Sequence, residues 1–561
     1  MKIYKGIAGA PGIAEGTLLY FEKGPAEHCE VSIDEAIEMA LEKVRTLGRK
    51  AHEDLGEDKA KIFAAYEMLL EDTMLTDPIK AEIEGGTEPK AAVEKITGMM
   101  SSRLASKDNE YMRQRADDIR YIGEILKDML SGAGGEFTFP DGDEKFVLAA
   151  HELTPVDTML FDQSRLAGLV TEMGGATSHT VILAKSLGIP AVVGVKVLDS
   201  ADSGKGAFLD GYTGTLVTNP DDAEKSRYTG LIADEEQLKV RLEGIKKADA
   251  HTADGERIAV AVNIGKPSDL KGTEDTAFDG VGLFRSEFLY SSTNKKPEKD
   301  EQTEAYRKAI EAVYPNPVTI RTIDVGGDKQ LAYLNMKAEE NPFLGNRGIR
   351  LCMNNTEIFA EQLEAILRAG AGKEVKIMLP MITCIDEIRK TRELIAEIEK
   401  RLDGEGADYC RSVKLGIMIE TPASAIMADV FARHCDFFSI GTNDLVQYVM
   451  AADRGNADVE NIYNPYHPAV LRMLERVIKA GADAGIEVSV CGDLAANTDF
   501  TKILLGMGLK KFSVPFPMVS RIKYLIGMID LADARKLAEE ILKAEDENEV
   551  IKILRKENRT L

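Results

Sequence analysis

The stretch from Gly174 to Gly194 reads Gly-Gly-Ala-Thr-Ser-His-Thr-Val-Ile-Leu-Ala-Lys-Ser-Leu-Gly-Ile-Pro-Ala-Val-Val-Gly. The apolar run Leu166–Val170 precedes its two glycines, which predicts a strand followed by a tight turn. Ser178 is a residue type that caps helices, and the apolar spacing after it predicts a helix that ends at Gly188. His179 is therefore expected in the first turn of a helix, directly behind a glycine turn.

A histidine in this position has two interpretations. The free N–H groups and the dipole at a helix N-terminus favour a bound anion by roughly 0.3–1 kcal/mol. A neutral imidazole, with an ordinary pKa near ~6.5, is a usable nucleophile at pH 7. The first interpretation is that His179 is phosphorylated and that the helix holds its phosphate. The second is that His179 only caps or packs the helix.

A resemblance separates the two interpretations. Gly-Gly-Ala-Thr-Ser-His-Thr, followed by Ala-Lys-Ser-Leu-Gly-Ile-Pro-Ala-Val-Val-Gly, resembles the phosphohistidine signature that phosphoenolpyruvate-utilising enzymes share. The match is long and far more specific than a single glycine-rich loop. The resemblance implies that His179 is the phosphorylated residue.

The composition is that of an ordinary globular protein. The chain has 561 residues, of which 44% are hydrophobic and 29% charged, and this length suits about two to four domains. No apolar run reaches the roughly 18 residues of a membrane span, so no membrane insertion is expected. The N-terminus lacks the apolar core of a secretory signal. The six cysteines form no Cys-x-x-Cys pair, which favours reduced thiols and a cytoplasmic location.

The formal net charge is −24, which argues against nucleic acid as a partner. It does not exclude an anionic substrate, because charges on a wet surface are screened beyond about 8–10 Å. One arginine about 4 Å from a phosphate gains about 4 kcal/mol at an effective dielectric of 20. A local arginine cluster therefore outweighs the acidic surface, which would itself suit a basic protein partner.

Strand and helix patterns divide the first 250 residues. Residues 1–20 read as strand-turn-strand, and strands alternate with short helices from Phe146 to Val217. We expect these two pieces to form one α/β unit, with an inserted bundle of four or five helices between them. The charged segment Asp221–Ala250 is expected to be a connecting helix. The helical stretches of the bundle are Ala36–Lys50, Lys59–Asp72, Pro89–Ser106 and Asp108–Leu130.

From Gly255 onward, apolar runs typical of strands alternate with helices, which predicts a (β/α)8 barrel. The fold class is therefore α/β multidomain, with a C-terminal barrel and an N-terminal α/β domain that contains the helical bundle. The eight runs are Ile258–Val262, Gly280–Leu283, Val318–Thr322, Val375–Met378, Leu415–Ile419, Phe437–Ile440, Glu487–Val490 and Phe512–Val514.

Polar side chains recur where these strands end, which is where barrel enzymes place their chemistry. Salt bridges on the barrel rim would explain two or three of them but not the whole ring. Arg285 and Arg321 have the fixed donors that bind phosphate and carboxylate, and Arg454 is a third candidate. Glu420 and Asp444 offer hard oxygen ligands suited to Mg2+. The full set of strand ends comprises Asn263, Arg285, Arg321 with Asp324, Met381, Glu420, Asn443, Asp444 and Cys491.

Six further blocks extend the resemblance over nearly the whole chain, and they are similar to enzyme I of the bacterial sugar phosphotransferase system. This is the family of phosphoenolpyruvate–protein phosphotransferases, within the phosphoenolpyruvate-utilising enzymes. Lys5-Gly6-Ile7 and the segment Arg115–Arg120 belong to the same pattern. The six blocks are GVGLFRSEFL (280–289), IRTIDVGGDK (320–329), ENPFLGNR (340–347), GIMIETPA (416–423), FFSIGTNDL (437–445) and CGDLA (491–495).

The resemblance implies an activity and an organisation. Phosphoenolpyruvate would phosphorylate His179, pyruvate would be released, and the phosphoryl group would pass to a histidine of the carrier protein HPr. A hinge is then needed, for which Gly132–Gly135 and Asp221–Ala250 are candidates. The implied domains are an α/β phosphohistidine domain (1–20 with 144–222), a helical HPr-docking subdomain (21–143), a linker helix (223–250) and a phosphoenolpyruvate-binding barrel that forms a homodimer (251–561).

Roles for individual residues follow from the resemblance alone. Phosphoenolpyruvate is expected to bind Arg285, Arg321, Arg454, Asn443 and the backbone beside Asp444, with Arg347 as a further arginine near the substrate. Glu420 and Asp444 are expected to hold Mg2+. Cys491 is expected to deliver a proton to the enolpyruvate carbon, although a lone cysteine after a strand is usually a small core residue. Thr158 matches a threonine beside the histidine.

Two alternatives stay open at this point. Pyruvate phosphate dikinase and phosphoenolpyruvate synthase share both signatures, but they need an ATP-binding domain, and a helical bundle already begins at Ser32 without a P-loop. A regulatory protein that only senses phosphoenolpyruvate is the second alternative. The docking face for HPr has the candidates Glu67, Met68, Glu71 and Asp72, which equally suit a solvated helix face. Departures from the family pattern are Asp493, Ala496, Asn346 and Pro515-Phe516-Pro517.

Overall fold

The computed structural model describes residues 1–21, 31–55, 57–105, 110–131, 140, 144–153, 161, 163–175, 178–196, 198–291, 295–326, 331–334, 336–337, 339–459 and 461–558. The chain divides into two compact units, Met1–Gln237 and Leu238–Leu561. No helix in the described part of the chain is both long enough and apolar enough to cross a membrane. Thr158 and the proposed hinge segment Gly132–Gly135 lie outside the described residues. The four-part division with its boundaries stays a prediction.

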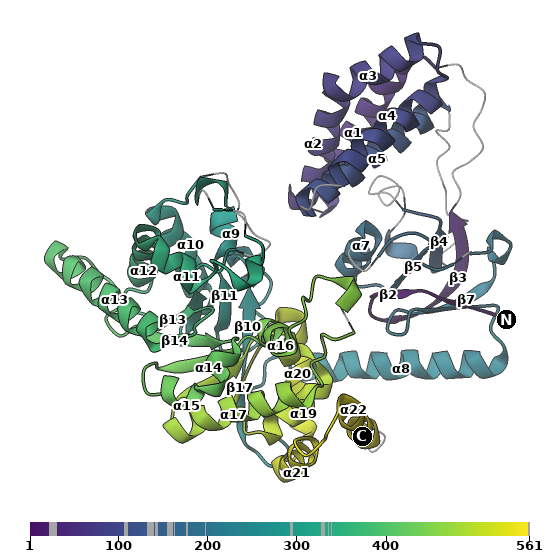
Figure 1. Cartoon of the computed structure of the whole chain (residues 1–561). Coiled ribbons are helices and arrows are strands. Elements are labelled where there is room, and N and C mark those ends of the chain that lie inside the picture. Colours follow the sequence, from purple (N-terminus) through teal and green to yellow (C-terminus); the bar gives the residue numbers. More distant parts are fainter. Residues whose placement is uncertain are drawn as a thin grey trace. The chain divides into compact units, whose positions relative to one another are not determined.

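An eight-stranded sheet organises the α/β part of the first unit (Figure 1), in the order β1-β8-β7-β3-β4-β5-β6-β2. Strand β3 pairs with β4 in parallel and with β7 antiparallel, so the start of the chain is built into the sheet made by residues 146–218. The helical bundle is therefore an insertion, as predicted. The strands are β1 (Lys2–Lys5), β2 (Ile7–Ala10), β3 (Ile13–Phe21), β4 (Phe146–Ala150), β5 (Leu166–Thr171), β6 (Ala191–Val193), β7 (Gly206–Asp210) and β8 (Thr215–Thr218).

Five helices are described between β3 and β4, one more than the stretches that the sequence delimited. The additional helix, α3, contains Pro78, which removes a hydrogen bond and disfavours a helix locally. It forms nevertheless because Asp72 caps it by accepting from the Met74 N–H and because Leu75 and Ile79 are buried in the bundle core. The helices are α1 (Ile33–Leu55), α2 (Glu57–Glu71), α3 (Thr73–Glu84), α4 (Pro89–Ala105) and α5 (Glu110–Leu130).

Eight parallel strands close into a barrel in the second unit, because β10 pairs with both β11 and β17. Each strand coincides with one of the eight predicted apolar runs to within a few residues. A short strand, β9 (Ala250–His251), adds to β10 in antiparallel fashion outside the closed ring. The barrel strands are β10 (Arg257–Ile264), β11 (Val281–Arg285), β12 (Val318–Arg321), β13 (Val375–Leu379), β14 (Lys414–Ile419), β15 (Phe437–Ile440), β16 (Glu487–Val490) and β17 (Lys511–Pro515).

Beyond residue 286, helices alternate with these strands and bury their apolar faces against them in one core. The helix that precedes them buries only Tyr228, which packs on Phe208 and Val217 instead. The α-helices are α8 (Asp222–Ile245), which runs from the first unit into the second, α9 (Glu287–Ser291), α10 (Lys299–Val313), α11 (Ile349–Asn354), α12 (Thr356–Ala369), α13 (Ile385–Glu405), α14 (Pro422–Ile426), α15 (Ala428–Phe431), α16 (Thr442–Met450), α17 (Pro468–Ala484), α18 (Asp493–Ala496), α19 (Thr498–Gly506), α20 (Val519–Met528), α21 (Leu531–Ile541) and α22 (Glu547–Asn558).

A buried carboxylate joins three of the barrel helices. Glu364 of α12 is 2% exposed and pairs with Lys299 of α10 at 2.9 Å. It also pairs with Arg368 of its own helix at 2.7 Å and with Arg401 of α13 at 2.5 Å. Burial would raise the pKa of Glu364, but the hydrogen bonds from these three cations lower it to about 2. The ionised carboxylate therefore contributes to the packing of α10, α12 and α13.

Candidate functional site

A cavity of about 380 Å3 opens where the barrel strands end. Its walls come from the ends of β11, β12, β14, β15 and β16 and from the loops and helical turns that follow them. Every barrel residue to which the sequence assigned a role is in this lining. The lining residues are Leu283, Arg285, Arg321, Asp324, Gly326, Phe343, Arg347, Met418, Glu420, Gly441, Asn443, Asp444, Arg454, Cys491, Gly492 and Asp493.

The parallel register brings two arginines to one edge of the cavity. Arg285 ends β11, Arg321 ends β12, and the two are register partners. A buried hydrogen-bond chain joins helix α12 to the ends of β11 and β12 behind them. In it, Gln362 Nε2 donates to Ser286 Oγ at 3.0 Å and Ser286 Oγ donates to the Arg321 carbonyl at 2.8 Å. The positions of both arginines are thus set by strand pairing and by this chain together.

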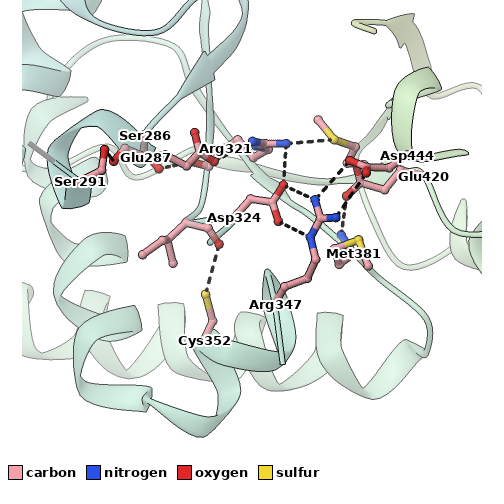
Figure 2. Close-up of polar contacts among 12 residues, drawn as sticks. Ser286, Glu287, Ser291, Arg321, Asp324, Arg347, Cys352, Met381, Glu420 and Asp444 are labelled. Atoms are coloured by element: carbon pink, nitrogen blue, oxygen red, sulfur yellow. Dashed lines mark hydrogen bonds and ion pairs between the residues drawn. The ribbon is translucent and has the colours of Figure 1, made fainter. Parts of the chain in front are cut away.

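Two of the four cavity arginines are held by carboxylates (Figure 2). Arg321 is paired with Glu287 at 2.6 Å and with Asp324 at 3.0 Å. Arg347 is paired with the same Asp324 oxygen at 3.0 Å and with Asp444 at 3.2 Å. Burial would lower the pKa of each arginine, but the neighbouring negative charges outweigh it and raise both pKa values. Both guanidinium groups therefore stay charged in a nearly dry site.

The other two arginines are not held in this way. Arg285 and Arg454 line the same cavity, and both are exposed at its mouth. Within the part of the chain that the structure describes, neither guanidinium group has a hydrogen-bond or ion-pair partner. The cavity therefore combines two fixed, neutralised arginines in its interior with two cationic groups that are available to an anionic ligand.

Glu420, which follows β14, is held in the cavity by a strained piece of backbone. The N–H of Met381 donates to Glu420 Oε1 at 2.6 Å, and Met381 has φ = 60°, which is uncommon for a residue with a side chain. The other carboxylate oxygen faces Gly441, where an added Cβ would lie only 2.7 Å from Oε2. Burial raises the pKa of Glu420 to about 8, helped by the charges of Asp444 and Asp324. The carboxyl groups of Glu420, Asp444 and Asp324 thus lie near one another in a buried site, where their negative charges repel.

This crowding fits a cation site. Glu420 and Asp444 are 1% and 7% exposed and line one cavity. Burial, and after it the charges of Asp444 and Asp324, raise the pKa of Glu420, and a bound divalent cation would oppose both effects by stabilising the ionised carboxylate. No group of three or more His, Cys, Asp or Glu side chains suited to a metal occurs among the described residues. Two protein carboxylates suit Mg2+, which keeps waters and takes oxygens from its substrate.

Cys491 lies at the floor of the cavity, among Leu283, Met378, Met418 and Phe437. The thiol is 2% exposed, and its Sγ lies 3.5 Å from the Ile440 carbonyl oxygen. Burial raises the pKa of the thiol to about 11. The group is therefore fully protonated at neutral pH, as a proton donor must be.

Asn443 faces the cavity but is already engaged. Its Nδ2 donates to Asp493 Oδ2 at 2.9 Å, and the Asp493 N–H donates back to Asn443 Oδ1 at 2.9 Å. Asp493, one of the departures from the expected pattern, thus orients the amide of Asn443. The other departures, Ala496, Asn346 and Pro515-Phe516-Pro517, are not among the lining residues of the described structure.

The first unit carries the remaining predicted residue, His179. Its backbone begins α7 (His179–Leu187), with Ser178 as N-cap and Gly188 in the left-handed conformation at the C-terminus, as predicted. Gly174 has φ = 107°, and a Cβ there would lie 3.1 Å from Ser178 Oγ, so a glycine is required at this turn. Ser178 makes no side-chain capping bond. Helix N-termini leave N–H groups without intrahelical partners, so α7 offers an anion-binding end at His179.

Sequence reasoning missed three parts of the site. Glu287 and Asp324 lie within the matching blocks, yet neither was assigned a role, although each is the buried partner of an arginine. Met381 was noted only as a strand end, whereas its backbone N–H holds Glu420. Glu287 and Asp324 could have been found from the sequence, because they lie in the same matching blocks as Arg285 and Arg321. No local signal indicates the role of the Met381 N–H, because its partner is 39 residues away.

Three family models match the chain. The phosphoenolpyruvate-utilising enzyme N-terminal domain covers residues 5–115, and the mobile domain of the same family covers residues 142–214. The phosphoenolpyruvate-binding domain of the family covers residues 239–531, which include the whole cavity lining. The three matches follow the order expected from the sequence signatures.

Curated relatives match over almost the whole chain. A phosphoenolpyruvate-protein phosphotransferase of Listeria innocua is 39% identical over 99% of this chain and 99% of its own. Proteins of the same name from Priestia megaterium (37% identical, 99% of each chain) and Enterococcus faecalis (36% identical, 98% of each chain) are also similar.

Proposed function

Because the chain belongs to the family of phosphoenolpyruvate-protein phosphotransferases, we propose that it transfers the phosphoryl group of phosphoenolpyruvate to its own His179 and then to a histidine of the carrier protein HPr. This is the first step of the sugar phosphotransferase cascade, in the cytoplasm. The observation that carries the proposal is the convergence of four arginines, four carboxyl side chains (among them Glu420 and Asp444) and one protonated thiol on one barrel cavity.

The four arginines divide into two roles. Arg285 and Arg454 have uncommitted donors, so they would bind the phosphate and carboxylate oxygens of phosphoenolpyruvate. Arg321 is preorganised by Glu287 and Asp324, and Arg347 is preorganised by Asp324. Both would meet the charge that develops on the transferring group. Asn443, oriented by Asp493, would add a neutral donor at the same wall.

Glu420 and Asp444 would hold Mg2+. Bound there, the cation would supply positive charge to the phosphoryl oxygens of the substrate. The Met381 N–H fixes the direction of the Glu420 carboxylate, so this ligand is in place before the cation arrives. Fixed ligands reduce the reorganisation that binding requires.

His179 and Cys491 would act on opposite sides of the breaking bond. The neutral imidazole of His179 attacks phosphorus in line, the bond between phosphorus and the enol oxygen breaks, and enolpyruvate leaves. Cys491 then donates its thiol proton to the terminal carbon of enolpyruvate, which gives pyruvate. The thiol must regain a proton before the next cycle, and the raised pKa of Cys491 favours that form.

His179 must reach two places, the barrel cavity and a histidine of HPr. One fixed position cannot serve both, so we include a swivel of the phosphohistidine domain in the proposal.

The helical subdomain is the proposed docking surface for HPr. On α2, Glu67 and Glu71 are paired with Arg45 at 2.5 and 2.7 Å, and Met68 between them is 63% exposed. An exposed apolar side chain within an acidic surface suits a partner with an apolar centre and a basic rim. The barrel is the proposed homodimer contact.

The test is phosphorylation of the full-length chain by 32P-labelled phosphoenolpyruvate with Mg2+. Wild type should acquire acid-labile label and release pyruvate, and added HPr should remove the label from the chain. His179→Ala should acquire none. The matched control is His151→Ala, because His151 is an exposed histidine of the same unit whose Nδ1 lies 2.6 Å from Glu172 Oε2. Full labelling of His179→Ala, or label that HPr cannot remove from wild type, would contradict the proposal.

A further inference from the structure

Arg347 is bound to one of the proposed metal ligands. Its Nη1 lies 3.3 Å from Asp444 Oδ1 and its Nη2 lies 3.2 Å from Asp444 Oδ2, so one guanidinium group covers both oxygens of the carboxylate (Figure 2). This is the bidentate geometry in which arginine binds carboxylates most firmly. Asp444 therefore has a bidentate cationic partner within the protein itself.

Arg347 also has a second anchor. Its Nε and Nη2 donate to Asp324 at 3.2 and 3.0 Å, and the guanidinium carbon lies 5.8 Å from the centre of the Phe343 ring. Gly326 leaves room for this arrangement, since a Cβ there would lie 2.4 Å from the Cβ of Arg347. Loss of the Asp444 contact would thus leave Arg347 in the cavity, still paired with Asp324.

Arg321 differs from Arg347 in its second carboxylate partner. It shares Asp324 with Arg347, but its other partner is Glu287, which is not a proposed metal ligand. Arg285 and Arg454 have no carboxylate partner within the described residues. Among the four cavity arginines, and within the described residues, Arg347 alone is therefore paired with a proposed metal ligand, Asp444.

We propose that Arg347 is a placeholder for the divalent cation: it neutralises Asp444 while the cation is absent and is displaced from that carboxylate when the cation binds. Its Nε and Nη2 keep their bonds to Asp324, and the donor capacity that it directs at Asp444, chiefly that of Nη1, becomes available to the anionic substrate. The inference rests on the proposed metal site at Glu420 and Asp444. It makes Arg347 a positioning residue that couples the two ligands, in addition to a binding group.

The coupling has a defined sign. In the substrate-free protein the cation must compete with Arg347, so its affinity is low. A phosphate or carboxylate group that draws Arg347 away from Asp444 removes the competitor and raises the affinity for the cation. By linkage, the cation raises the affinity for the anion by the same factor. Substrate and cation would therefore enter as a cooperative pair.

The experiment measures Mn2+ binding to the substrate-free, full-length protein by electron paramagnetic resonance, which needs no turnover. Arg347→Met should tighten Mn2+ binding by about tenfold or more, within the range of typical coupling factors. Arg454→Met is the matched control, because it removes the same charge from the same cavity without a contact to Asp444. Its effect should be clearly smaller. Arg347→Lys keeps the charge but cannot bridge Asp444 and Asp324 with a planar fork, so it should fall between wild type and Arg347→Met.

Two outcomes separate the inference from the function on which it rests. If Arg347→Met and Arg347→Lys, both shown to be folded by circular dichroism, tighten Mn2+ no more than Arg454→Met does, the placeholder is refuted. The Arg347→Lys result decides the matter if Arg347→Met does not fold. The metal site itself is tested with Glu420→Gln and Asp444→Asn in the presence of phosphoenolpyruvate. If neither weakens Mn2+ binding, the proposed metal site fails independently of Arg347.

Discussion

Gly441 is the residue whose substitution tests the cation site most directly. It follows β15 and precedes α16, and its backbone is fixed at both ends, since its N–H donates to the Ile419 carbonyl at 3.1 Å and its carbonyl accepts from Leu445 at 3.0 Å. In Gly441→Ala, the new Cβ would lie 2.7 Å from Glu420 Oε2 and 2.9 Å from the sulfur of Met418. Because the backbone cannot retreat, the carboxylate has to move.

The size of the effect follows from these contacts. Oε2 of Glu420 would have to retreat by about 0.7 Å to reach the ordinary contact distance of 3.4 Å. Its other oxygen is tied to the Met381 N–H at 2.6 Å, so the shift strains or breaks that bond. Overpacking of this kind costs about 1–3 kcal/mol, and displacement of a metal ligand lowers metal affinity by about 10–100-fold, which corresponds to about 1.4–2.8 kcal/mol.

The assay is Mn2+ titration of the folded, full-length variant in a His179→Ala background, so that phosphoenolpyruvate can be present without turnover. The matched control is Gly404→Ala in α13, where an added Cβ meets nothing within 4 Å. Alanine is the better helix former there, so the control should be neutral or slightly more stable. Equal Mn2+ affinities in Gly441→Ala and Gly404→Ala would refute the reasoning about Glu420.

Three further predictions concern catalysis, binding and stability. Cys491→Ala should lower the rate of pyruvate formation by about 10²–10⁴-fold with little change in KM. Wild type should show no loss of rate near pH 8.5, where an ordinary cysteine ionises, because burial raises the pKa of this thiol to about 11. Arg285→Gln should raise the KM for phosphoenolpyruvate by about 30-fold or more, which corresponds to about 2 kcal/mol. The melting temperature should stay unchanged, since no described ion pair is lost. A fall in melting temperature that accompanies the rise in KM would indicate a structural role instead. Glu364→Gln should destabilise the barrel at pH 7 by about 2–3 kcal/mol. Because the pKa of Glu364 is lowered to about 2, this stabilisation is present above pH ~4.5 and is lost as the pH falls toward 2. The melting temperatures of variant and wild type should therefore converge on acidification. A difference in melting temperature that stays constant with pH would exclude the ionised carboxylate as its source.

Much of the architecture was predictable because its causes are local. Eight apolar runs between helical stretches are enough to indicate the barrel, and strand pairing then places the residues at the strand ends on one edge. Arg285 and Arg321 could be assigned to one site for this reason before any contact was known. The turn at Gly174 and the helix end at Gly188 follow from the same kind of local signal, since both need a positive φ.

The α3 helix shows where local reasoning fails. Its sequence contains Pro78, which argues against a helix, but the burial of Leu75 and Ile79 in the bundle core outweighs this preference. Propensities differ by fractions of a kcal/mol up to about 3 kcal/mol for proline, whereas burial of two large aliphatic side chains contributes a comparable or larger amount, about 1.5–3 kcal/mol each.

By itself, the sequence determined which residue types stand at the strand ends and at the start of α7, and the resemblance of its motifs supplied their expected roles. Which of these groups are paired with another side chain and which are available to a ligand depends on the folded barrel. Asp444 meets Arg347 across 97 residues, and Glu420 meets the Met381 N–H across 39. Such pairs depend on closure of the barrel, which brings distant strand ends together in a space too dry to leave a charge unpartnered, and no local pattern in the chain encodes that choice of partner.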